Sequence, residues 1–179
     1  MSHRFVVVSG CSGAGKSTLV AELGRRAYRV VDEPGRRIVR QELAAGGTAL
    51  PWSDPAGFAR RAVSLAIADW EAARGNPGWT VFDRGLVDAA AALEQASGEP
   101  ALQPLARAHP YGRTVFLAPP WPEIYVQDEE RRHDFAAAAA EYERLLQAYG
   151  ALGYRIVLLP KAPAGTRADF VMAELGAAG

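Results

Sequence analysis

Residues 5–18 read F-V-V-V-S-G-C-S-G-A-G-K-S-T, and this stretch decides the fold. Its first four residues are apolar, which predicts a short buried strand. The next residues follow the spacing G-x-x-x-x-G-K-[ST] of a phosphate-binding loop, or P-loop, and lead into a helix. Glycines permit backbone turns that point successive N–H groups inward, so the loop is expected to form a concave nest for phosphate oxygens.

Individual positions of the motif have expected roles in holding a nucleotide. Lys16 is expected to reach the β- and γ-phosphates from the start of the helix, where the helix dipole also favours negative charge. Ser17 offers a hydroxyl to Mg²⁺. Lys16 and Lys161 are the only lysines in a chain whose other basic residues are arginines, and a compact ammonium suits a tight nest. The residues expected to bind the nucleotide are Gly10, Cys11, Ser12, Gly13, Ala14, Gly15, Lys16, Ser17 and Thr18.

The bulk composition restricts the class of protein. With 179 residues, 49% hydrophobic and 22% charged, the chain is expected to form one globular domain over residues 1–179. A formal net charge of zero argues against a nucleic-acid or polybasic membrane surface. No apolar run approaches the roughly 20 residues that span a bilayer. The single cysteine cannot form an internal disulfide, and we expect no signal peptide and a cytoplasmic location.

Short apolar runs alternate with helical patterns along the chain. After the first strand, further strands are expected at residues 28–31, 79–82, 114–117 and 154–159. Helices are expected over residues 16–27, 35–45, 55–74, 86–96, 135–149 and 167–175, whereas residues 97–110 resemble a proline-interrupted connection. This alternation predicts an α/β fold, a three-layer α/β/α sandwich around a five-stranded parallel sheet.

Acidic residues follow the second and third expected strands. Ligands of parallel sheets bind beyond the carboxyl ends of the strands, so these acids are expected beside the P-loop. Asp83 is a candidate to hold Mg²⁺ through water opposite Ser17, the alternative being an N-cap of the next helix. Asp32 or Glu33 is a second candidate carboxylate for the metal, and Glu33 is a candidate to accept a proton from a substrate hydroxyl. A solvated turn or an N-cap is the alternative for this pair.

Arginines and aromatic residues supply the other candidates. Arg131 and Arg132 lie in an expected lid segment around residues 120–134, where positive charge can stabilise the transition state; a self-paired charged helix start is the alternative. The candidates for contact with a phosphate acceptor are Arg36, Arg37, Arg84, and, for stacking on a flat ring, Trp52 and Phe58, although packing is an equal alternative for the aromatic pair. The histidines His3, His109 and His133 lack metal-ligand spacing.

Taken together, these motifs resemble a known family. The segments G-C-S-G-A-G-K-S-T, V-V-D-E-P-G-R, V-F-D-R-G, A-P-P-W-P with D-E-E-R-R, and Y-R-I-V-L-L-P are similar in order and spacing to AAA-type predicted ATPases of the P-loop kinase lineage, a group related to the ribosylnicotinamide kinase domain of NadR. The chain also resembles deoxyribonucleoside kinases. That resemblance implies Glu33 as general base, Asp83 as a metal-side or catalytic carboxylate, and Arg131 or Arg132 as lid arginine. The third-strand motif reads D-R-G, without the hydroxyl residue common after the arginine in nucleoside kinases.

The sequence therefore favours a P-loop kinase that uses ATP and Mg²⁺. Its acceptor is expected to be a small molecule such as a nucleoside, a nucleotide or a related metabolite, with no nucleic-acid or membrane partner. Separate strand-end acids for metal and acceptor, together with the paired lid arginines, favour this function. The alternatives are an ATPase or regulatory NTP-binding module without such an acceptor, and a pocket that only binds nucleotide. The sequence leaves the oligomeric state open.

Overall fold

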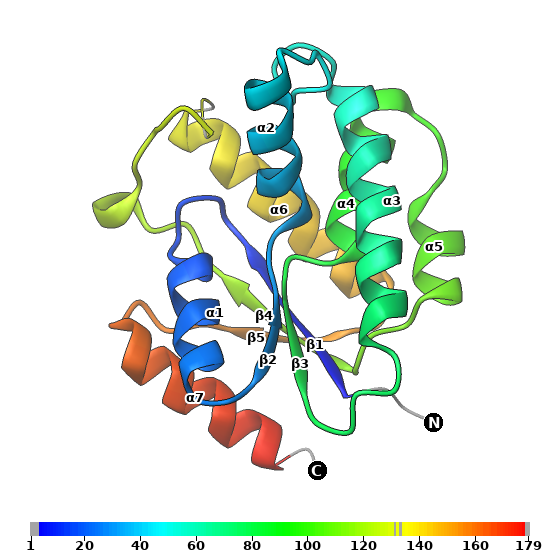
Figure 1. The fold of residues 1–179 in the computed structure, drawn as a ribbon. Coiled ribbons are helices and arrows are strands. Elements are labelled where there is room, and N and C mark those ends of the chain that lie inside the picture. The colour runs from blue at the N-terminus through cyan, green and yellow to red at the C-terminus, as the bar shows by residue number, and fades with distance from the viewer. Residues whose placement is uncertain (1–3, 131, 133, 178–179) are drawn as a thin grey trace.

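A parallel sheet runs through the centre of the computed structural model, which describes residues 4–130, 132 and 134–177 (Figure 1). Within these residues the sheet has five strands in the order β2-β3-β1-β4-β5, and every pairing is parallel. All six residues of β1 are buried, because it is the central strand and both of its faces are covered. The strands are β1 (Phe5–Gly10), β2 (Arg29–Val31), β3 (Thr80–Asp83), β4 (Thr114–Ala118) and β5 (Arg155–Leu158).

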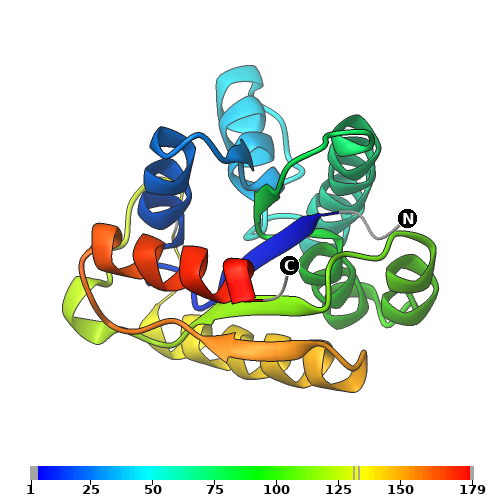
Figure 2. The same ribbon diagram turned by 90° about the horizontal axis from the view of Figure 1, so that it is seen from below.

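Helices cover both faces of the sheet (Figure 2). On one face α1 packs beside α7, and on the other α4 contacts α6, with α3 packed along α4 and α2 along α3. The predicted three-layer α/β/α sandwich is confirmed. The helices are α1 (Lys16–Arg25), α2 (Pro34–Ala45), α3 (Pro55–Ala73), α4 (Leu86–Ser97), α5 (Leu102–Ala108), α6 (Phe135–Ala151) and α7 (Ala164–Ala177), with a 3₁₀ turn, η1 (Pro122–Ile124), after β4.

Helix α5 lies where the sequence pattern predicted only a proline-interrupted connection. Its proline, Pro104, is in the first turn, where the missing N–H removes no intrahelical hydrogen bond. The carboxylate of Glu94 accepts hydrogen bonds from the N–H groups of Ala101 and Leu102, both at 2.8 Å. A cap supplied by the preceding helix therefore stabilises this short helix, and such a distant cap gives no local signal in the sequence.

The ends of β3 and β4 are joined by hydrogen bonds to β1 and its loop. Val8 pairs with Asp83 in register, and its carbonyl accepts a hydrogen bond from Arg84 N at 2.9 Å. Cys11 N in turn donates to Ala118 O at 2.8 Å. These bonds bring Asp83 and Arg84 to the same edge of the sheet as the P-loop.

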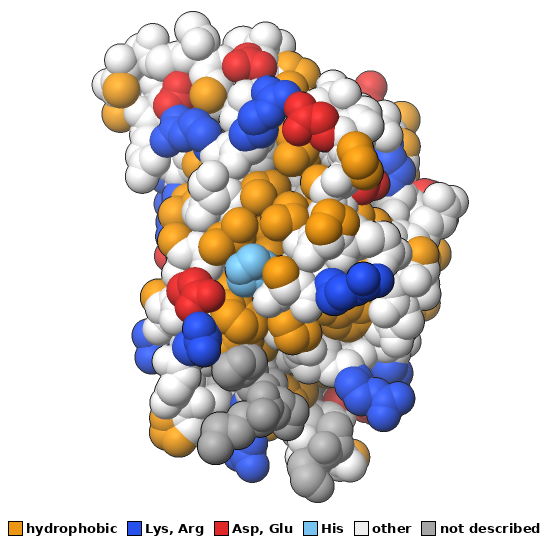
Figure 3. All heavy atoms as spheres, turned by 90° about the vertical axis from the view of Figure 1, so that its right-hand side faces the viewer, with side chains coloured by type: hydrophobic (Ala, Val, Ile, Leu, Met, Phe, Trp, Pro, Cys, Tyr) orange, Lys and Arg blue, Asp and Glu red, His pale blue; other side chains and the backbone are white. Residues whose placement is uncertain are grey.

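The face drawn in Figure 3 carries apolar side chains around a histidine. His109 is half-buried and packs edge-on against Trp70, with ring centroids 5.2 Å apart. Its ring therefore completes an aromatic contact at the surface, away from the P-loop edge of the sheet. Among the described residues, none of the helices combines the length and the apolar character that a bilayer crossing requires.

Candidate active site

The P-loop folds into a nest whose lysine lies across it. Gly10 and Gly15 have φ angles of 113° and 77°, in a region that residues with a Cβ rarely adopt. A Cβ on Gly10 would also lie 2.4 Å from the carbonyl oxygen of Ala118. Lys16 Nζ donates a hydrogen bond to Cys11 O at 2.7 Å, so the ammonium faces the loop backbone. Both side chains of this pair are buried.

Burial lowers the pKa of Lys16 to about 8, and the positive charge of Arg84 adds to this effect, while Glu33 and Asp83 oppose it. An ammonium in this position has lost much of its hydration, and no carboxylate of the described residues bonds directly to it. A bound anion would restore that lost stabilisation. The electrostatics of the nest therefore suit a phosphate ligand.

Asp83 lies directly opposite the P-loop hydroxyl. Ser17 Oγ donates to Asp83 Oδ2 at 2.7 Å, whereas Asp83 Oδ1 is buried and has no hydrogen-bond partner in the described part of the chain. Burial, followed by the charge of Glu33, raises the pKa of Asp83 to about 6, and Lys16 acts in the opposite direction. A buried carboxylate with one unused oxygen beside a hydroxyl fits a divalent cation.

The alternative role of Asp83, an N-cap of α4, does not match the structure. The N–H of Gly85 donates to Asp88 Oδ2 at 3.0 Å, and the N–H of Leu86 donates to the Tyr111 hydroxyl at 3.0 Å. These partners leave Asp83 facing Ser17. Among residues 4–130, 132 and 134–177, no three His, Cys, Asp or Glu side chains form a metal-binding group. A cation at Ser17 and Asp83 would thus take most of its ligands from phosphate and water, as Mg²⁺ commonly does.

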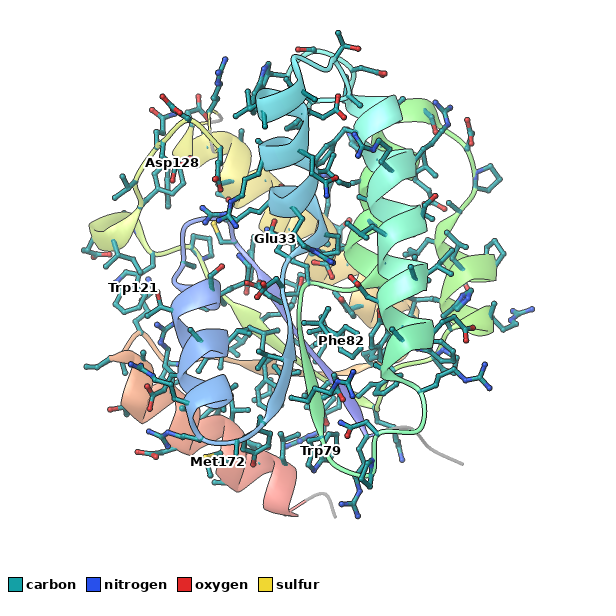
Figure 4. All side chains as sticks on the ribbon, viewed as in Figure 1. Glu33, Trp79, Phe82, Trp121, Asp128 and Met172 are labelled. Atoms are coloured by element: carbon teal, nitrogen blue, oxygen red, sulfur yellow. The ribbon has the colours of Figure 1, made fainter. Side chains whose placement is uncertain are left out.

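Arg84 and Glu33 lie between the P-loop nest and a neighbouring cavity, and we call this pair the wall. The Arg84 side chain, 12% exposed, is within 3.4 Å of Glu33 Oε1, 3.1 Å of Asp88 Oδ1 and 2.6 Å of Glu141 Oε1. Burial alone would lower its pKa, but the charges of Glu141, Glu33 and Asp88 hold the pKa of Arg84 well above its usual range. Arg84 therefore stays charged and fixes Glu33, which Figure 4 shows at the start of α2. Asp32 is exposed.

A cavity of about 770 Å³ adjoins this wall, between α2, α3, α4 and α6. Ser12 of the P-loop reaches its lining, as do Glu33 and Arg84. Buried apolar side chains form part of the lining: Val39, Ala62, Ala89 and Leu145. A volume of this size, lined by buried apolar side chains and several charged groups, is typical of a small-molecule site.

The sequence predicted five residues that contact the acceptor and two arginines of a lid segment, and five of these seven residues line the cavity. Trp52 and Phe58 contribute aromatic surface, and the guanidinium of Arg132 lies 4.2 Å from the centre of a Trp52 ring. Arg36 also lines the cavity, at 3.7 Å from Asp128 Oδ2 and 3.9 Å from Glu130 Oε2. Together with the candidate base Glu33, the predicted site residues that line the cavity are Arg36, Trp52, Phe58, Arg84 and Arg132.

Two predicted residues fall outside this group. Arg37 turns towards α3, where it forms an ion pair with Asp69, and it does not line the cavity. Its place one residue after Arg36 on a helix explains the different direction of its side chain, because adjacent helical side chains point about 100° apart. Arg131 lies outside the described residues.

Sequence reasoning missed a polar cluster beneath the wall. Asp88 accepts hydrogen bonds from Ser9 Oγ and, at 2.6 Å, from the Tyr149 hydroxyl, in addition to its contacts with Gly85 and Arg84. The available signal was an acidic residue at the third position of α4, where the Asp88 side chain reaches back to the N-cap backbone at Gly85. Tyr149 comes from α6, and nothing local in the sequence links it to Asp88.

We expect Tyr149→Phe to lower the free energy of unfolding by about 1–2 kcal/mol, because a buried carboxylate oxygen then loses a donor. Burial, with the charge of Asp88, raises the pKa of Tyr149, so the hydroxyl remains a donor. Urea denaturation measures the change. Tyr142→Phe is the matched control on the same helix, because the described residues offer its hydroxyl no hydrogen bond; equal losses for the two variants would contradict the assigned role.

A family model described as "AAA domain" matches residues 5–167. The chain belongs to this AAA-domain family. No curated protein matches the sequence closely enough to count as a relative. The match covers the P-loop, the strand-end acids and the cavity walls, so the site described above lies within the family's domain.

Solved structures share the fold of this AAA-domain chain. Deoxyadenosine kinase from M. mycoides with bound dATP is 12% identical, with a TM-score of 0.65 over 97% of this chain and 100% of that one. The same kinase with the products dCMP and a flexible dCDP is 14% identical, with a TM-score of 0.65 over 97% and 99% of the two chains. Its dCTP complex is 15% identical, with a TM-score of 0.53 over the same shares. These similarities confirm a P-loop nucleoside kinase-like fold.

Proposed function

We propose that this protein transfers the γ-phosphoryl group of ATP, in the presence of Mg²⁺, to a hydroxyl or phosphate of a nucleoside-like small molecule. One observation carries the proposal. The P-loop nest and the 770 Å³ cavity adjoin: Ser12 of the P-loop lines the cavity together with Glu33 and Arg84, and these two residues shift the pKa of Lys16 in opposite directions. The fold shared with deoxyadenosine kinase supports a nucleoside-like acceptor.

In this proposal the phosphates lie in the nest and the acceptor lies in the cavity. The backbone N–H groups and Lys16 hold the triphosphate, and Ser17 and Asp83 are the side chains that would hold Mg²⁺. The metal supplies positive charge to the phosphate oxygens. The apolar part of the cavity, with Trp52 and Phe58, takes the flat ring of the acceptor.

Glu33 is the better placed of the two candidate bases. It lines the acceptor cavity, whereas Asp83 is buried against Ser17 and is absent from the cavity lining. When the acceptor is a hydroxyl, its proton passes to Glu33 as its oxygen attacks the γ-phosphorus, and ADP leaves. Arg84 holds Glu33 in position and, with Arg132 of the lid segment around residues 120–134, brings positive charge to the transferring group.

A panel of nucleosides, nucleotides and related metabolites tests this function by acceptor-dependent ADP release. Slow turnover of ATP alone, with a sharp rise for one compound that becomes phosphorylated, is the expected result. Unchanged turnover across the panel would favour the ATPase alternative, and tight MgATP binding without hydrolysis would indicate a binding module. A single domain over residues 1–179 and a cytoplasmic location also remain our proposals.

Asp83→Asn is expected to raise the Mg²⁺ concentration for half-maximal activity by about 10- to 100-fold, because the amide keeps the shape of the side chain and loses its charge. Magnesium titration at saturating ATP measures the change. Asp54→Asn is a matched control, since Asp54 caps α3 at Gly57 N and asparagine caps helices equally well. An unaltered magnesium requirement in Asp83→Asn would remove this residue from the metal site.

A further inference from the structure

A buried arginine from the last helix contacts the outer side of the P-loop. Arg167 is 4% exposed, and its Nη1 donates hydrogen bonds to Ala14 O and Gly15 O, both at 3.2 Å. Its Nε is buried without a partner among the described residues. The guanidinium lies 5.6 Å from a ring centre of Trp121, which Figure 4 shows on the segment after β4, beside α1. Burying such a group is costly, so the position calls for a role.

The two carbonyl contacts fix the direction of two amide groups. In a trans peptide the C=O of one residue and the N–H of the next point in opposite directions. Holding Ala14 O and Gly15 O towards Arg167 therefore turns the N–H groups of Gly15 and Lys16 to the opposite side of the loop. No carbonyl or side chain in the described part of the chain accepts a hydrogen bond from either N–H. They are available to phosphate oxygens.

Of the two loop residues whose carbonyls Arg167 contacts, Gly15 has a backbone conformation that favours glycine. A Cβ on Gly15 would lie 2.9 Å from Arg167 Nη2, in addition to the strain of a φ angle of 77°. Gly15 O also accepts the first hydrogen bond of α1, from Leu19 N at 3.1 Å. Arg167 thus acts at the junction between the nest and the helix that follows it.

We infer that Arg167 is a positioning residue, which orients the Gly15 and Lys16 amides for phosphate from behind the loop without touching the nucleotide. This inference rests on the proposed function, because it assumes that the nest holds a triphosphate. It adds α7 to the nucleotide site, although this helix lines no part of the acceptor cavity.

The experiment compares Arg167→Met with Arg167→Lys and a matched control, Arg26→Met. Arg26 also joins α1 to α7, through Asp169 and the carbonyl of Gly165, but at the far end of α1 from the nest. Calorimetry measures the binding of MgATP and of magnesium tripolyphosphate, which lacks base and ribose. Hydrogen exchange of residues 11–18 is followed without nucleotide, and thermal unfolding reports the stability of each variant.

For Arg167→Met we expect both ligands to bind about 10- to 100-fold more weakly, by the same factor, because charged hydrogen bonds to the loop are lost. The amides of the P-loop should exchange faster. Arg167→Lys should bind both ligands more tightly than Arg167→Met and more weakly than the wild type. If the methionine variant does not fold, the same measurements are made on Arg167→Lys. Arg26→Met should bind both ligands within about twofold of the wild type, since a surface ion pair contributes little, even if it unfolds at a lower temperature.

Three results would overturn the inference. Loss of affinity for ATP alone would mean that Arg167 contacts the base or ribose. Unchanged affinity for both ligands would mean that the carbonyl contacts do not order the nest. Equal acceleration of loop exchange in Arg26→Met would reduce Arg167 to general packing. If wild-type protein binds neither ligand, the proposed function fails, and the exchange data still decide whether Arg167 orders the loop.

Discussion

Replacing Lys16 by alanine is expected to reduce kcat/KM for ATP by about 10³-fold or more, because the variant loses the ammonium that meets the charge developing on the phosphates. The side chain is buried, and its one hydrogen bond within the described part of the chain goes to Cys11 O in the loop. The fold should therefore persist. ADP release at several ATP concentrations measures the loss, and thermal unfolding shows whether the domain remains folded.

Lys161→Ala is the matched control for this variant, since Lys161 is the other lysine of the sequence and lies exposed after β5. It should turn over ATP at the wild-type rate. Near-normal activity of Lys16→Ala would remove the main argument for a nucleotide in the nest. A folded but inactive variant beside an active control is the outcome that the buried ammonium predicts.

Glu33→Gln is expected to lower kcat for phosphoryl transfer by about 10²- to 10⁴-fold while leaving the affinity for MgATP within about twofold, because the variant lacks a general base yet keeps the nest. Glutamine preserves the size of the side chain, and Arg84 retains its ion pairs with Asp88 and Glu141. Single-turnover transfer to the acceptor found in the panel separates the chemical step from binding.

Asp32→Asn is the control for the loss of a neighbouring carboxylate, because Asp32 is exposed and does not line the cavity. Its rate of transfer should be close to that of the wild type. A loss in Glu33→Gln that is confined to ATP affinity would reassign Glu33 to the metal. A full loss with an acceptor that attacks through a phosphate would also count against the base, since such an acceptor has no hydroxyl proton to remove.

The sequence predicted the sheet well because its strands are short apolar runs between helical patterns. The P-loop of residues 10–17 and the acids after β2 and β3 could be placed at one edge, since parallel strands share their direction. The cap of α5 and the buried partners of Asp88 could not be predicted, because they come from distant elements. The same holds for Arg167, which appears in the sequence as one ordinary arginine on a terminal helix.

The directions of individual arginine side chains could not be predicted from the sequence either. Arg36 and Arg37 are equivalent in the pattern, yet the first lines the cavity and the second pairs with Asp69 on α3. Arg84 was expected to contact an acceptor, and in the structure its side chain is surrounded by Glu33, Asp88 and Glu141. Pairing with acids on three separate segments is set by packing, which composition and spacing do not encode.

Cys11 is the sole cysteine of the chain, and its side chain is completely buried in the hydrophobic core. A thiol-specific reagent can therefore modify the protein at one residue only, and only while the structure around that residue is open. The rate of such labelling measures how often the structure around the P-loop opens. Cys11 can therefore report on local opening of the P-loop without the introduction of another cysteine.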